Sequence, residues 1–70
     1  MNSNKLKKAI NRKGLKIRYI AEKLGISHEA MYNKVKGKTE FKASEISALI
    51  DLLDLTANDV FEIFFARKVG

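Results

Sequence analysis

Side chains that can form hydrogen bonds with a nucleic acid are concentrated in the middle of this 70-residue sequence. Imidazole, carboxylate, phenol, hydroxyl and carboxamide groups can each bond to the edge of a base. Five such residues lie within one short stretch: Ser27, His28, Glu29, Tyr32 and Asn33. Cations, which bind phosphate oxygens without reading sequence, flank this stretch on both sides: Lys13, Lys16, Arg18, Lys36, Lys38 and Lys42.

Most of the base-reading assignments in this stretch have an alternative. His28 could donate to guanine, or it could be a solvated residue without a task. Glu29 could accept from cytosine N4, or it could only complement the dipole at a helix start. Asn33 is suited to a bidentate pair with adenine. Tyr32 could contact a thymine methyl group or a phosphate, or it could lie half-buried over the domain.

Little in the sequence could support catalysis. There is one histidine and no cysteine, and we find no inward pair of carboxylates and no glycine-rich phosphate loop. We therefore expect no enzyme activity, no cofactor, no metal site and no small-molecule substrate. The lack of cysteine, of a signal peptide and of a long apolar run favours a soluble cytoplasmic protein without a membrane partner.

The charge of the chain is divided between its two halves. Residues 1–42 contain 12 basic and 3 acidic residues, a net charge of +9. Residues 43–70 contain 2 basic and 5 acidic residues, a net charge of −3. One end of the molecule is therefore expected to attract a polyanion. A basic surface that serves only solubility is the alternative, but its coincidence with base-reading side chains favours nucleic acid.

Five short helices in one domain, residues 1–70, are expected to position these side chains. Apolar residues recur at helical spacing, no strand-like alternation is present, and no proline interrupts the pattern. The predicted helices run from a Ser3 cap to Gly14, from about Lys16 or Ile17 to Gly25, from a Ser27 cap to Gly37, from about Ala43 to Leu53, and from a capping pair of Thr56 and Asp59 through Phe65.

The second and third predicted helices meet at a sharp corner. Ala21 is small enough to let the two helices cross closely, and Gly25 can adopt the positive φ that the turn requires. Met31 and Val35 give the following helix its own buried face. This pattern predicts a helix-turn-helix, in which the second helix lies in the major groove of DNA and reads bases.

Several longer segments follow the pattern of a known family: IAEKLGIS, KVKG, GKTEFKASEISALI and LDLTANDVFEIFF. Together they resemble the Cro/repressor-type (XRE-like) helix-turn-helix proteins of bacteria and their phages. The resemblance implies an all-α, compact five-helix, lambda-repressor-like DNA-binding domain with the helix-turn-helix at helices 2 and 3. It also implies a transcription regulator that binds operators in double-stranded DNA, often as a homodimer.

Three positions depart from that family pattern. Relatives often have Thr or Ser at the position of Lys16 and Gln at that of Ile17, where these residues cap the second helix and contact a phosphate. We expect Lys16 and Arg18 to bind the phosphate as cations instead. Lys34 stands where Ile or Leu is common, so Val35 is expected to provide the packing there.

The last predicted helix is more apolar than one buried face requires. Phe61, Phe64 and Phe65 could fill the bottom of a small core, or some of them could form a two-fold contact between two copies. Phe41 is expected to pin the loop before the fourth helix to the core. Two functions remain open. One is a sequence-specific DNA-binding repressor or activator, and the other is a protein-interaction module, such as an antitoxin or antirepressor, that keeps the helix-turn-helix as a scaffold.

Overall fold

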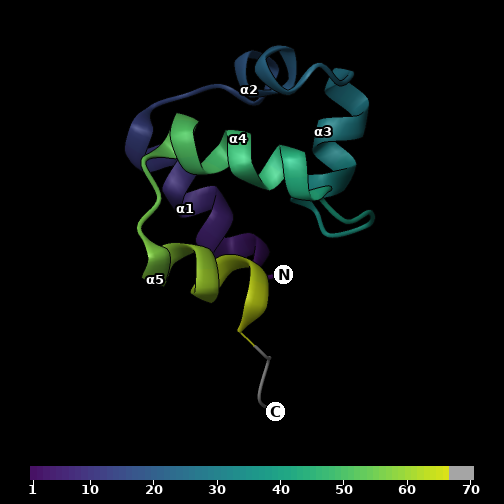
Figure 1. Ribbon diagram of the computed structural model, residues 1–70. Helices are drawn as coiled ribbons and strands as arrows, with labels where there is room; N and C mark the ends of the chain where they lie inside the picture. Colours follow the sequence, from purple (N-terminus) through teal and green to yellow (C-terminus); the bar gives the residue numbers. More distant parts are fainter. Residues whose placement is uncertain (67–70) are drawn as a thin grey trace.

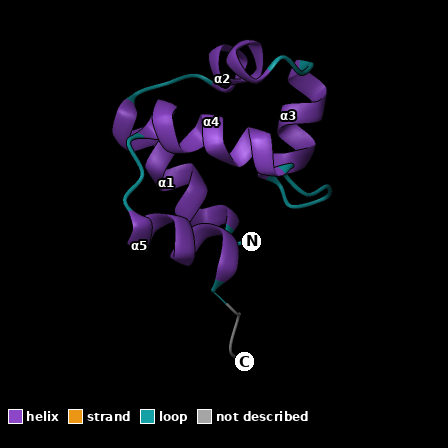
Figure 2. Ribbon diagram, in the orientation of Figure 1, coloured by secondary structure: helices purple, strands orange, loops and turns teal. Residues whose placement is uncertain are grey.

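Helices joined by short turns make up the computed structural model, which describes residues 1–66 (Figures 1 and 2). These residues contain no strand, so the all-helical, five-helix domain predicted from the sequence is confirmed. The helices are α1 (Ser3–Lys13), α2 (Ile17–Leu24), α3 (His28–Val35), α4 (Ala43–Leu53) and α5 (Ala57–Val60), and α5 continues directly into a π-helical turn, η1 (Phe61–Phe65).

One core lies between the helices. In Figure 1, α2 and α3 lie together at one end of the molecule and α5 lies at the opposite end, with α1 and α4 between them. Each of the first four helices contributes a completely buried side chain, and the set is Leu6, Ile20, Met31, Leu49 and Leu53. Burial of a side chain of this size contributes about 1.5–3 kcal/mol, so these few residues supply much of the driving force for the fold.

The corner between α2 and α3 forms as the sequence predicts. Gly25 ends α2 with a φ of 72°, and the N–H of Ile26 donates to the carbonyl of Ala21 at 3.0 Å. No atom lies within 4 Å of the place that a Cβ on Gly25 would occupy, so the glycine is required by its backbone conformation rather than by space. Ser27 Oγ then accepts from the N–H of Ala30 at 3.0 Å and opens α3.

Two helix ends differ from the prediction. The N-cap of α1 is Asn2 rather than Ser3, because the Oδ1 atom of Asn2 accepts from the N–H of Lys5 at 3.1 Å. The backbone N–H of Asn2 also donates to the carbonyl of Ile63 at 2.7 Å, which fixes Asn2 against η1. α3 ends at Val35 with Lys36 as its C-cap, so Gly37, the residue predicted to end this helix, lies one residue beyond the cap.

The last helix is wider than a regular α-helix over its second half. The N–H of Ala66 donates to the carbonyl of Phe61 at 2.7 Å, which is the spacing of a π-helix. Phe64 packs edge-on against Phe41 at 6.0 Å between ring centroids, so the predicted anchoring of the loop by Phe41 is confirmed. Phe61 and Phe65 remain 57% and 62% exposed.

Candidate nucleic-acid interface

An open groove of about 570 Å³ lies between α1, the start of α2 and α3, and we call it the α1–α3 groove. Its lining residues are Lys7, Ile10, Asn11, Leu15, Lys16, Ile17, Arg18, His28, Tyr32, Val35 and Lys36. Ile10 and Val35 are buried and form part of its floor. Four of the lining residues are cations and none is an aspartate or glutamate, so the charged side chains of the groove are all positive and favour negatively charged groups nearby.

The α3 side of the groove is an ordered row of three side chains. His28, Tyr32 and Lys36 are spaced four residues apart and therefore lie along one stripe of the helix. The His28 and Tyr32 rings have centroids 4.9 Å apart, and the Nζ atom of Lys36 lies 5.8 Å from the centroid of the Tyr32 ring. Tyr32 is 45% exposed. All three residues are exposed, so the imidazole nitrogens, the phenol hydroxyl and the ammonium group are accessible, while the His28 and Tyr32 rings pack against each other.

The start of α2 forms the second wall of the groove. Lys16 is the N-cap residue and its side chain makes no capping bond. The N–H groups of Ile17, Arg18 and Tyr19 belong to the first turn and have no acceptor within the helix. Backbone donors, the positive end of the helix dipole and two cationic side chains therefore occur together at one end of α2.

The remaining base-reading candidates lie on α3 outside the groove. Ser27 is exposed, and its hydroxyl oxygen is used as the cap of α3. Glu29 is exposed and Asn33 is half-buried. Each follows a member of the groove row by one position, so the two form the neighbouring stripe of the helix. The structure thus places all five candidates at the N-terminus or on the outward surface of α3.

The predicted phosphate contacts separate into three groups. Lys16, Arg18 and Lys36 line the groove. Lys38 and Lys42 are exposed in the segment of residues 36–42 that follows α3, which we call the 36–42 loop. Lys13 does not line the groove, because its Nζ atom pairs with Asp54 at 2.8 Å. Lys7 and Asn11 of α1 also line the groove, although sequence reasoning did not select them.

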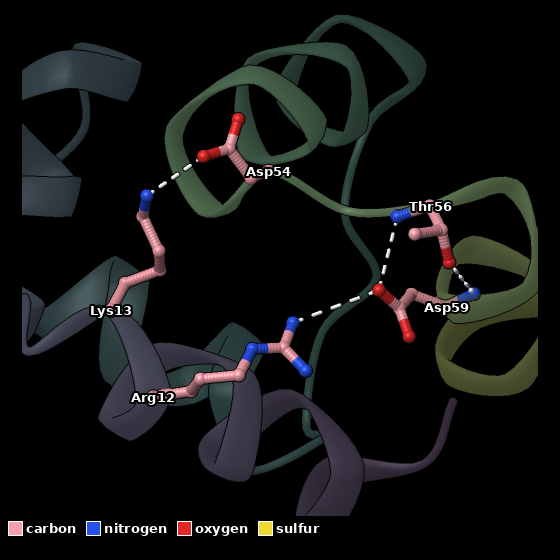
Figure 3. A network of polar contacts seen from close by, with 5 residues as sticks. All are labelled: Arg12, Lys13, Asp54, Thr56 and Asp59. Carbon is pink, nitrogen blue, oxygen red and sulfur yellow. Dashed lines mark hydrogen bonds and ion pairs between the residues drawn. The ribbon is translucent and has the colours of Figure 1, made fainter.

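Ion pairs engage the other face of α1. Arg12 and Lys13 reach toward the C-terminal half, where Arg12 pairs with Asp59 at 3.6 Å and Lys13 with Asp54 (Figure 3). The hydrogen bond and charge of Lys13 lower the pKa of Asp54. A hydrogen bond from the N–H of Thr56, supported by the charge of Arg12, lowers the pKa of Asp59. Both carboxylates are therefore ionised at neutral pH and offset the cations that face them.

The same pattern continues at the start of α1, where Lys5 pairs with Glu62 at 2.9 Å. By contrast, the four groove cations form no ion pair with any residue in 1–66: Lys7, Lys16, Arg18 and Lys36. Pairing thus offsets the charges of Lys5, Arg12 and Lys13 on the side of α1 that faces α4 and α5, although Lys8 on that side forms no ion pair within residues 1–66. The positive charge of the groove is uncompensated.

Lys34 is a cation that the structure removes from the surface of α3. Its side chain is 12% exposed and its Nζ atom pairs with Glu45 of α4 at 2.9 Å, whose side chain is 8% exposed. Sequence reasoning missed this pair. The available signal was that Glu45 lies four residues before Leu49 and so belongs to the inward stripe of α4.

Residues 1–66 contain no group of three histidine, cysteine, aspartate or glutamate side chains that is placed to hold a metal ion. None of the described helices is long and apolar enough to cross a membrane.

A family model described as "Protein of unknown function (DUF739)" matches residues 2–67 of the sequence. No curated protein and no solved structure matches the sequence. Because the matched region spans nearly all of the 70 residues, the chain belongs to the DUF739 family.

Proposed function

We propose that this protein binds double-stranded DNA at specific sequences and regulates transcription, with α3 in the major groove. The observation that supports this most strongly is the α1–α3 groove, where four cations without ion-pair partners among residues 1–66 line the surface from which His28 and Tyr32 project. Duplex DNA carries one negative charge per about 1.7 Å of its axis, so a surface of this kind attracts it strongly. The resemblance to the Cro/repressor-type proteins supports the same function.

The size and position of α3 fit this role. An α-helix with its side chains is about 10–12 Å across, which fits the major groove of about 12 Å width, and the eight residues of α3 give a segment about 12 Å long to lie in it. Its exposed N-terminal end carries Ser27, His28 and Glu29, and this is the part of a recognition helix that approaches bases. We assign guanine to His28, cytosine to Glu29 and adenine to Asn33 as the preferred bases.

Phosphate contacts are proposed on both sides of α3. On one side, the groove cations and the free N–H groups at the start of α2 face one strand of the duplex. On the other side, Lys38 and Lys42 extend from the 36–42 loop. Such contacts fix the position of α3 on the duplex, while the side chains of α3 select the sequence.

We further propose that two copies associate through the last helix. Phe61 and Phe65 expose more than half of their surfaces, and contact between two copies would bury them. Phe64 contributes at the edge of this surface, because it is half-buried against Phe41. A two-fold dimer would present two α3 helices about 34 Å apart and select a palindromic site.

Selection of binding sites from random duplex DNA tests this function. We expect the purified protein to enrich one motif with two-fold symmetry. The variant Lys16→Ala, Arg18→Ala serves as a control, because loss of phosphate contacts should weaken binding without changing the enriched motif. Failure of the folded protein to enrich any motif would contradict the proposal and favour a protein-interaction module.

A further inference from the structure

Lys34 connects α3 to the 36–42 loop through a single ammonium group. Its Nζ atom donates to the carbonyl of Glu40 at 3.0 Å and to the Oε1 atom of Glu45 at 2.9 Å. The same atom lies 5.8 Å from the centroid of the Phe41 ring, within the range of a cation–π contact. One side chain of α3 therefore holds two consecutive residues of the loop.

Glu45 extends this connection by one more residue. Its Oε1 atom, already bonded to Lys34, also accepts from the backbone N–H of Lys42 at 2.8 Å. Burial by itself raises the pKa of Glu45, but the Lys42 N–H and the Lys34 ammonium together lower it below its usual value. The carboxylate is therefore ionised at neutral pH, and the pair fixes three consecutive loop residues, 40–42.

The opposite end of the loop is fixed independently. The N–H of Lys38 donates to the carbonyl of Asn33 at 2.9 Å, and Gly37 supports the turn with a φ of 85°. Lys38 and Lys42 lie at these two anchors, and both are exposed. Their backbone positions are therefore determined by contacts with α3 and α4 rather than by the loop itself.

Stability alone does not explain a buried ion pair at this place. Removal of two charges from water costs several kcal/mol per ion, and replacement of such a pair by apolar residues of similar volume is often neutral or stabilising. An apolar pair, however, has no directional contact with the carbonyl of Glu40 or the N–H of Lys42. What the ion pair supplies beyond packing is the placement of the loop backbone.

We propose that the Lys34–Glu45 pair is a positioning element for DNA binding, which holds residues 40–42 of the loop so that Lys42 meets a phosphate beside α3. This inference rests on the proposed function. It assigns Lys34 and Glu45 no contact with DNA. Their effect reaches the duplex only through the backbone of the loop.

The variant Lys34→Met, Glu45→Met tests the positioning role. Methionine is close in volume to both side chains, but it cannot bond to the carbonyl of Glu40 or to the N–H of Lys42, so both anchors are removed. One positive and one negative charge are removed, so the net charge stays at +6 and cannot itself alter DNA affinity. Thermal unfolding confirms that the variant is folded, and fluorescence anisotropy measures its affinity for a short labelled duplex of mixed sequence at several salt concentrations.

We expect the slope of log affinity against log salt to become shallower by about 0.9, because one phosphate contact loses its fixed geometry. In the unaltered protein, Lys38→Ala and Lys42→Ala should each make the slope shallower by about 0.9. In the variant without the ion pair, Lys42→Ala should have less than half of this effect, whereas Lys38→Ala should keep its full effect, because Asn33 holds that end of the loop. A full effect of Lys42→Ala in both backgrounds would overturn the proposal.

The outcomes separate this inference from the proposed function. An unaltered protein that binds no duplex would refute both. An unaltered protein that binds, with a variant of identical slope, would refute the positioning role alone. If the double variant does not fold, Lys34→Met, Glu45→Gln provides the test, because it removes the bond to the carbonyl of Glu40 at the same net charge. A shallower slope supports positioning, and an equal or steeper slope overturns it.

Discussion

Replacement of two groove cations tests the proposed phosphate contacts most directly. In the proposed complex the four groove cations together with Lys38 and Lys42 make six phosphate contacts per chain, which gives, for each bound chain, a slope of log affinity against log salt of about −5.4. In the variant Lys16→Ala, Arg18→Ala four contacts remain, and the slope becomes about −3.6. Between about 50 and about 200 mM salt, affinity should fall about 2,000-fold for the unaltered protein and about 150-fold for the variant.

Fluorescence anisotropy with a labelled duplex measures both slopes, and α1 offers a control of equal charge. The variant Arg12→Ala, Lys13→Ala also removes two positive charges, but from residues paired with Asp59 and Asp54 (Figure 3). Exposed ion pairs contribute only about 0–1 kcal/mol, so the control should remain folded. We expect its slope to stay near that of the unaltered protein. If the control flattens the slope as much as the groove variant does, affinity follows net charge alone and the groove has no special role.

Three further predictions concern other residues. Asn33→Ala should lower discrimination at one base pair by about 1–3 kcal/mol in competition between the selected site and its single mismatches, whereas equal losses at all positions would place Asn33 away from the bases. Because the folded-state pKa of Glu45 is lowered, its charge stabilises the fold above the unfolded pKa of about 4.3 and this contribution is lost as the pH falls through the lowered value. The melting temperature of the unaltered protein should therefore fall more between about pH 5 and about pH 3 than that of Glu45→Gln, and parallel curves would contradict this. Phe61→Ser, Phe65→Ser should convert a dimer to a monomer in sedimentation equilibrium with a stability loss of about 1–2 kcal/mol, since both rings are more than half exposed. An unchanged assembly state would exclude this surface as the contact.

The helices could be predicted closely because their signals are local. The bounds of α4, Ala43–Leu53, follow directly from apolar spacing, and Gly14 and Gly25 end α1 and α2 as expected. The start of α1 was misplaced by one residue, since Asn2 and Ser3 are adjacent and both residue types cap helices. The bond from the N–H of Asn2 to the carbonyl of Ile63 helps to fix Asn2 as the cap, and that contact joins opposite ends of the described chain.

The positions of the candidate residues could be predicted only on α3, where the spacing within a single helix is enough to separate outward from inward side chains. The outward surface of α3 follows from the inward positions of Met31 and Val35, so its candidates are correctly exposed or half-exposed. The α1 side of the groove depends on how α1 packs against α3, which no local pattern specifies. Lys7 and Lys13 are both lysines of α1, yet Lys7 lines the groove and Lys13 pairs with Asp54.

The placement of acidic groups bears on specificity rather than on affinity. A protein discriminates between sites by the difference between specific and sequence-blind binding, so features that weaken sequence-blind attraction raise discrimination. Asp54 and Asp59 offset cations of α1 that lie outside the groove. Glu29 is a carboxylate on the exposed surface of α3 that forms no ion pair within residues 1–66. It repels phosphates at every sequence, but a cytosine amino group opposite it would offset that repulsion at one base. In the proposed function Glu29 therefore weakens binding to most DNA sequences and is compensated only at those with a cytosine opposite it, which raises the discrimination between sites.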